Sequence, residues 1–220
     1  MTPSPDVCAD APAAANVRGP LLIAAALTLA LTVVRVAGER LRWAPCLFGR
    51  EAGGGGALLG IGWFIPVCGV WFARRLVAAG LAPDRRRALG WAALGLLGVA
   101  AVFAVGKLLL PVTACTFAFV ALALPLCALL AFRAWPDLAR VLLAYAAMAR
   151  LPVLVVTVFA VAGNWGTHYE QLAPGSPEMG HVARTLILCV AQICLWVPLT
   201  VLGGTFAGAW LLRPQQRHCR

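Results

Sequence analysis

The sequence predicts an all-α fold: a polytopic membrane bundle of six transmembrane helices with both termini in the cytoplasm. Of its 220 residues, 62% are hydrophobic and only 12% are charged, whereas a soluble domain has about 45–50% apolar and about 25% charged residues. The apolar residues also fall in runs close to the roughly 20 residues that a membrane helix requires. This composition argues against a soluble enzyme, a disordered chain or a small disulfide-stabilised protein.

Six apolar segments account for the predicted helices, and charged or turn-forming residues bound them. The stretch from Ala88 to Phe132 contains one charge, Lys107, and because Pro111 follows it closely we place a turn between two helices there. The last segment is longer than a hydrocarbon core of about 30 Å requires, so we expect tilt, a kink at Pro198 or interfacial ends. The predicted helices are 20–36, 56–73, 88–108, 111–132, 138–162 and 182–212.

The transmembrane domain is predicted to occupy residues 18–213, with a short tail on each side. Residues 1–17 are rich in Ala, Pro and Asp, which indicates a flexible tail before a retained first helix. A cleavable signal would instead begin with a basic region before a short apolar core. Residues 214–220 form a short basic tail, and the loops are too short to hold a soluble domain.

The distribution of basic residues predicts the orientation. The formal net charge is +10, and eleven Lys and Arg residues fall on the side of the termini against six on the other, with Arg150 set aside. Basic residues are enriched in cytoplasmic loops. The composition, in which Lys107 is the only lysine, is typical of a GC-rich bacterial gene, so we predict a multi-pass protein of the bacterial plasma (inner) membrane.

The predicted partners are the lipid bilayer and other membrane proteins. The basic residues lie at helix ends and form no stripe with interleaved aromatic residues, so nucleic acid is not an expected partner. Gly204 and Gly208 have a spacing that lets helix backbones approach closely, which in a multi-span protein indicates packing within the chain.

Arg150 is the candidate functional residue inside a predicted helix. If 138–162 is one span, a guanidinium there costs about 2.5–3.5 kcal/mol and marks a functional site by default. Pro152 removes a helical hydrogen bond and could leave carbonyls lining a polar site. In the alternative interpretation, 137–149 is an interfacial helix and Arg150 lies among headgroups. Predicted helix cores contain no acidic residue, which leaves an anionic ligand, a lipid headgroup or backbone carbonyls as partners.

Two loops on the face opposite the termini carry further candidates. In 163–181, His168 and Glu170 have the chemistry of acid/base partners or metal ligands, but they match no known motif. We therefore favour an ordered cap or a partner-docking loop. The 37–55 loop is predicted to lie on the membrane surface, or alternatively to fold over 163–181 and supply arginines to an anionic ligand. The candidate ligand or partner residues are Arg150, Pro152, Asn164, Trp165, His168, Tyr169, Glu170 and Gln192.

The sequence carries no catalytic, cofactor-binding or metal-binding motif, so we predict no catalytic residue, cofactor or metal. Our leading hypothesis is a non-enzymatic accessory or scaffold subunit of a membrane complex. A second hypothesis is a small transporter or lipid-handling protein that uses Arg150, which requires a polar cavity around it. A third is a membrane enzyme with His168, Tyr169 and Glu170 converging at the outer face.

The stretch ARLPVLVVTVFAVAGNWGTHYE, residues 149–170, resembles a group of small, uncharacterised bacterial multi-span membrane proteins. The resemblance rests on Arg150, Pro152 and residues 164–169. It implies a bacterial plasma-membrane location and does not imply any activity.

Overall fold

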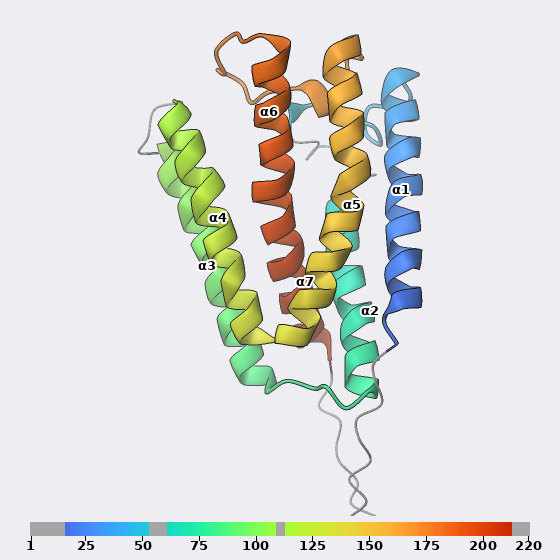
Figure 1. The fold of residues 1–220 in the computed structure, drawn as a ribbon, viewed down its shortest axis with the longest axis vertical. Coiled ribbons are helices and arrows are strands. Elements are labelled where there is room, and N and C mark those ends of the chain that lie inside the picture. Colours follow the sequence, from blue (N-terminus) through green and yellow to red (C-terminus); the bar gives the residue numbers. More distant parts are fainter. Residues whose placement is uncertain (1–15, 53–60, 109–112, 213–220) are drawn as a thin grey trace, which may run out of the picture.

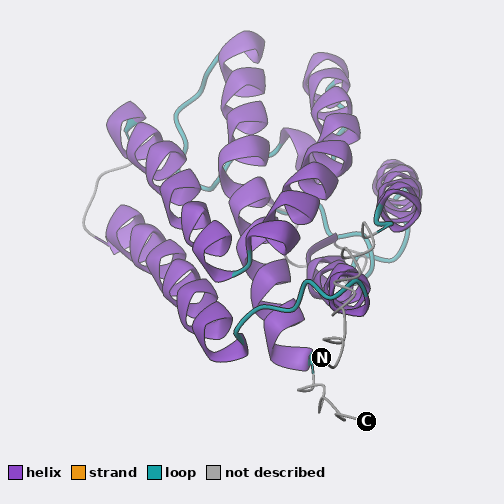
Figure 2. Ribbon diagram, turned by 60° about the horizontal axis from the view of Figure 1, so that its bottom comes forward, coloured by secondary structure: helices purple, strands orange, loops and turns teal. Residues whose placement is uncertain are grey.

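The computed structural model describes residues 16–52, 61–108 and 113–212. This part of the chain consists of helices and connecting loops, without a β-strand (Figures 1 and 2). The elements in order are α1 (Arg18–Arg40), η2 (Ile61–Trp63), α2 (Phe64–Ala78), α3 (Arg85–Leu108), α4 (Ala114–Ala134), α5 (Pro136–Gly163), η3 (His168–Glu170), α6 (His181–Ala191), the π-helical segment η4 (Gln192–Trp196) and α7 (Val197–Leu211).

Five of these helical stretches are long and apolar enough to cross a membrane: α1, α3, α4, α5 and the continuous run from α6 to α7. They match five of the six predicted spans. The predicted second span, 56–73, begins outside the described residues. Its described part enters α2, whose 15 residues would extend about 22 Å. Most of the predicted tails, 1–17 and 214–220, also lies outside the described residues.

The helices run back and forth, so that α1 starts and α7 ends at the same end of the bundle (Figure 1). We call this the terminal end. The opposite, loop end carries residues 41–52 and the connection between α5 and α6. Helix α7 contacts α2, α3, α4 and α5 and therefore lies at the centre, whereas α1 packs mainly against α5. The shared end of the termini agrees with the prediction; their cytoplasmic location stays a prediction.

Helix α5 is one continuous helix, which makes the interfacial alternative for 137–149 wrong. Pro136 starts it at a position where its missing N–H costs nothing, and Asn164 ends it in the left-handed conformation. Pro152 lies inside without ending the helix. The buried face recurs every three or four residues through Leu142, Ala149 and Val153. Tertiary packing along this whole face is what keeps the segment a single helix.

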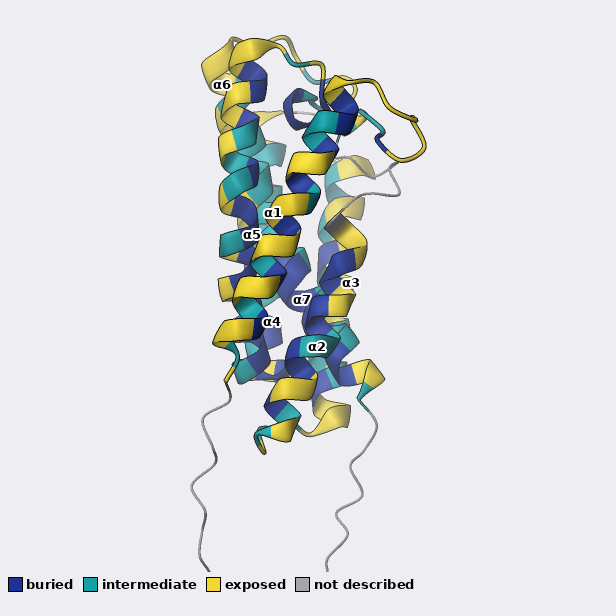
Figure 3. Ribbon diagram, turned by 90° about the vertical axis from the view of Figure 1, so that its right-hand side faces the viewer, coloured by how far each residue is buried: buried dark blue, intermediate teal, exposed yellow. Residues whose placement is uncertain are grey.

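One face of α1 is buried and largely polar, while the rest of the helix is exposed or half-buried (Figure 3). Its exposed residues are mostly apolar and include Leu22, Ile23 and Leu27. Ala24, Thr28 and Thr32 share this face, as their four-residue spacing indicates. Thr28 Oγ1 lies 2.8 Å from the Ala24 carbonyl oxygen, to which it donates, and 2.9 Å from Tyr145 Oη on α5. Arg35 and Glu39 continue the same buried face toward the loop end.

Helices α2 and α7 meet at glycines, and we expect Gly69→Ala to destabilise the protein by about 1–3 kcal/mol. A methyl group at Gly69 would overlap the backbone of Gly204, which cannot move aside as a flexible side chain can. Gly90→Ala is the control, because the space around Gly90 in α3 is open. Thermal unfolding in dodecyl maltoside should give a lower midpoint for Gly69→Ala only; equal midpoints would show that α2 and α7 do not approach so closely.

Candidate functional site

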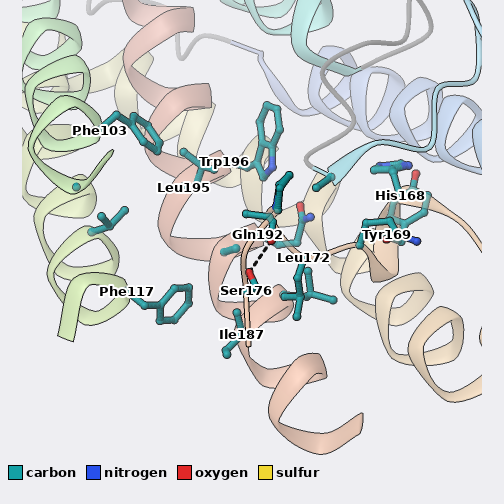
Figure 4. A pocket seen from close by; sticks show the side chains of 18 of the residues that line it. Phe103, Phe117, His168, Tyr169, Leu172, Ser176, Ile187, Gln192, Leu195 and Trp196 are labelled. Carbon is teal, nitrogen blue, oxygen red and sulfur yellow. Dashed lines mark hydrogen bonds between the residues drawn. The ribbon is translucent and has the colours of Figure 1, made fainter. Parts of the chain in front are cut away.

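A cavity of about 770 Å³ lies in the loop-end half of the bundle. This size falls within the roughly 300–1,000 Å³ of typical small-molecule sites. Phe103 and Phe117, from α3 and α4, face Ile187 and Leu195, from α6 and η4, across its apolar part (Figure 4). Its polar lining residues include Arg35, Lys107, Arg150, His168, Tyr169, Gln192 and Ser176.

The π-helical segment η4 supplies two of the side chains that surround Arg150. Pro198 has no N–H to donate to the carbonyl four residues earlier, at Cys194, so the hydrogen-bond pattern is already interrupted at this turn. The predicted disturbance at Pro198 therefore takes the form of a π-helical stretch that ends just before it. Such segments occur frequently at functional sites. Here the segment contributes Gln192 and Trp196 to the cavity lining.

Arg150 is 6% exposed and reaches this cavity from the middle of α5. Its Nη1 donates to Gln192 Oε1 at 3.2 Å, and its Cζ lies 5.1 Å from the centroid of the Trp196 ring. Both partners are electrically neutral. Its Nε is buried and has no hydrogen-bond partner. Within the described part of the chain, no carboxylate forms an ion pair with this guanidinium.

A second polar cluster joins α1 to the loop after α5. The Glu39 carboxylate is buried and accepts from Arg35 Nε at 2.8 Å and from the backbone N–H of His168 at 2.8 Å. Glu39 Oε1 also lies 2.6 Å from His168 Nδ1. Burial lowers the pKa of the His168 imidazole below its usual value, and the Arg35 charge acts in the same direction, although the hydrogen bond to Glu39 opposes both.

Tyr169 lies between the two clusters. Its ring centroid is 3.9 Å from that of His168, and its hydroxyl is buried without a hydrogen-bond partner. Burial raises the pKa of this phenol well above its usual value, so it remains a neutral donor. Tyr169 and Arg150 therefore each present an unsatisfied buried donor, which is a costly arrangement in the absence of an acceptor.

Glu170 and Trp165 order the loop and do not line the cavity. The Glu170 carboxylate accepts from the backbone N–H groups of Trp165, at 2.9 Å, and Gly166. Its carbonyl accepts from Arg184 Nε at 2.8 Å. Arg40 donates to the Trp165 carbonyl at 3.2 Å and lies over the Trp165 ring. The loop is thus held to α1 and α6 as an ordered cap.

Among the predicted candidates, the structure places four along one cavity: Arg150, His168, Tyr169 and Gln192. The hydrogen bond from Arg150 to Gln192 also fits the expectation that Gln192 bonds another helix. Asn164 is an exposed cap, and Pro152, Trp165 and Glu170 are not among the lining residues. The convergence of His168, Tyr169 and Glu170 in one pocket is therefore wrong, because the Glu170 carboxylate bonds its own loop.

Sequence reasoning missed Arg35, Glu39 and Trp196. Placing Glu39 and Arg40 in a surface loop is wrong, because α1 extends to Arg40 and Glu39 is buried. The contact with 163–181 that the alternative requires is confirmed by the Glu39–His168 and Arg40–Trp165 contacts, whereas the supply of arginines to an anionic ligand stays a prediction. Arg35 and Glu39 could have been found from the sequence, since they continue the helical spacing of Thr28 and Thr32 and therefore lie on the same face of α1.

We expect the protein to lose thermal stability as the pH falls from 7.5 to 5.5. The folded state lowers the pKa of His168, so the unfolded chain binds more protons around and below the usual value of about 6.5 and is favoured by acid. His168→Gln should flatten the dependence of the unfolding midpoint on pH. His181→Gln, at an exposed histidine, should keep it. An unchanged slope in His168→Gln would assign the acid sensitivity to other groups.

Its long apolar helices make this chain an integral, multi-pass membrane protein. Comparisons with protein-family models, curated proteins and solved structures found no match to it.

Proposed function

We propose that this protein binds an amphiphile with an anionic headgroup and handles or transports it within the membrane. The observation that carries this proposal is the buried charge of Arg150, whose hydrogen-bond and ring partners are neutral. A charge in the membrane interior is costly and is normally paired. An anion in the cavity supplies the missing counterion.

The donors around Arg150 fit an oxyanion. Arg150 Nε and Tyr169 Oη are both buried, both lack a partner in the described chain, and both belong to cavity-lining residues. A carboxylate or phosphate has several acceptor oxygens and can accept from more than one donor. Binding of such a headgroup would satisfy two groups whose desolvation is otherwise uncompensated.

The rest of the cavity fits a hydrocarbon chain. Phe103, Phe117, Ile187 and Leu195 form an apolar wall next to the polar end (Figure 4). Helix α6 forms one side of the cavity through Ile187, Leu188 and Ala191, and none of its residues is fully buried. A small hydrophilic anion would leave this apolar surface unused, whereas an amphiphile covers it.

Binding of fluorescent amphiphiles to the full chain in dodecyl maltoside tests the proposal. We expect saturable binding of a pyrene-tailed alkyl sulfonate, and much weaker binding of the same tail carrying a trimethylammonium or an uncharged hydroxyl head. Equal binding of all three would mean that the cavity recognises only the tail, and no binding of the sulfonate would overturn the proposal.

In this proposal the loop end, and with it the cavity, faces the outer side of a bacterial plasma membrane, which the excess of basic residues on the side of the termini supports. The accessory or scaffold role stays a prediction, tested by whether a stoichiometric partner accompanies the protein through purification in mild detergent. No particular contact of the described chain favours it over ligand binding.

A further inference from the structure

We propose that the preferred ligand is a lipid-like phosphate monoester bound as its dianion, and that His168 takes up one proton when it binds. This inference rests on the proposed function and specifies its ligand. It assigns His168 the role of a second positive charge in the site, present only when the ligand is bound.

The hydrogen bonds of His168 determine which nitrogen can take the proton. Glu39 Oε1 lies 2.6 Å from Nδ1, and because a carboxylate can only accept, Nδ1 carries its hydrogen. Nε2 is then the basic nitrogen of the neutral ring. His168 lines the cavity, so a proton on Nε2 would place its charge beside the ligand.

The charged and titratable groups around His168 and the cavity come from four elements: α1, α3, α5 and η3. Arg35 and Glu39 lie on α1, and their ion pair has a separation of 2.8 Å. Tyr169 is the neighbouring residue in η3, and Arg150 extends from α5 into the same cavity. Lys107, at the end of α3, also lines the cavity, but it is exposed. Because Arg35 and Glu39 cancel, Arg150 is the buried net charge of the empty site.

The balance between the charges of the site and of the ligand indicates which anionic headgroup is preferred. A sulfonate or carboxylate carries one negative charge, which Arg150 balances, so a monoanion gives His168 no net reason to become charged. A phosphate monoester has a second pKa near 6 and carries close to two negative charges at neutral pH. Arg150 and a protonated His168 together balance that dianion. Because the dianion favours the imidazolium, binding of phosphate and binding of the proton strengthen each other.

The pH dependence of binding tests this inference with two probes that share a tail. We expect a pyrene-tailed alkyl phosphate to bind more tightly than the matching sulfonate at pH 7, with an affinity that falls by up to about tenfold per pH unit above pH 7. Sulfonate affinity should stay nearly constant over this range. In His168→Gln the phosphate preference should disappear, whereas His181→Gln should behave like the wild type.

Each outcome discriminates between the two proposals. Tight sulfonate binding without a phosphate preference would overturn the role of His168 and leave the proposed function standing, whereas absence of binding by both probes would overturn both. If His168→Gln keeps the phosphate preference and the pH dependence of binding, the proton resides on the ligand and the role of His168 is overturned. A ³¹P chemical shift typical of the monoanion for the ligand bound to the wild type would lead to the same conclusion. Inorganic phosphate that competes as strongly as the alkyl phosphate would overturn the lipid-like part of the inference.

Discussion

Arg150→Met is expected to weaken binding of the anionic amphiphile by about 100-fold or more. Removing one member of a buried charge pair costs about 2–5 kcal/mol, and 1.4 kcal/mol corresponds to tenfold in affinity. Arg150 provides the charge and an unsatisfied buried donor of the cavity. Arg150→Lys should recover part of the affinity, because lysine keeps the charge but not the planar fork of donors. Fluorescence titration with the alkyl sulfonate and alkyl phosphate measures both effects.

The same substitution should leave the ligand-free protein as stable as the wild type or make it more stable. Replacing a buried charged group by an apolar side chain of similar size is often neutral or stabilising by about 1–4 kcal/mol. The matched control is Arg140→Met on the same helix, where the side chain is exposed and pairs with Asp137. A lower unfolding midpoint together with lost binding would indicate that Arg150 holds the fold. Unchanged binding would remove Arg150 from the site and contradict the proposed function.

Much of the fold is predictable because membrane helices must satisfy their own backbone hydrogen bonds and must match the bilayer in length. This constraint located α1, α3, α4 and α5 to within a few residues. It also located the long run that contains α6 and α7. The same reasoning could not find the π-helical turn, since hydropathy carries no information about the backbone hydrogen-bond pattern within a helix. Pro198 was the local signal, and it indicated a disturbance without specifying its form.

The site was only partly predictable, because its residues come from α1, α5, η3 and η4. Arg150 stood out, since a charge in an apolar run is unusual. Glu39 did not, because a carboxylate at a helix end is ordinarily an interfacial residue. Its role depends on the contact with His168, more than 120 residues away in the sequence. Such a pairing follows from tertiary packing, which periodicity in one segment cannot indicate.

The connection between Glu39 and His168 shows why the cap and the cavity form a unit. Glu39 anchors both the ring and the backbone N–H of His168, and His168 directly precedes Tyr169. Tyr169 carries one of the unsatisfied donors of the site. The position of the ligand-binding donors therefore depends on an acid in α1 that does not itself line the cavity.

Glu39→Ala is accordingly expected to lower the free energy of unfolding by about 3–5 kcal/mol, because removing one partner of a buried ion pair leaves the other charge uncompensated. It takes away the acceptor for Arg35 Nε and for two donors of His168. Chemical denaturation in mixed micelles, or the thermal midpoint, measures the loss. Glu51→Ala, at an exposed carboxylate in the loop that follows α1, should change little.

The double variant Arg35→Met/Glu39→Met separates the charge effect from the packing effect. If the cost of Glu39→Ala comes from an uncompensated Arg35 charge, removing both charges should restore most of the stability, since apolar replacements of buried pairs are well tolerated. The double variant should bind the amphiphile poorly, because Glu39 no longer holds the ring and the backbone N–H of His168. Restored stability with wild-type affinity would show that the cap keeps its position without Glu39. The arrangement of the ligand donors would then depend on the contacts that Arg40 and Arg184 make with the loop.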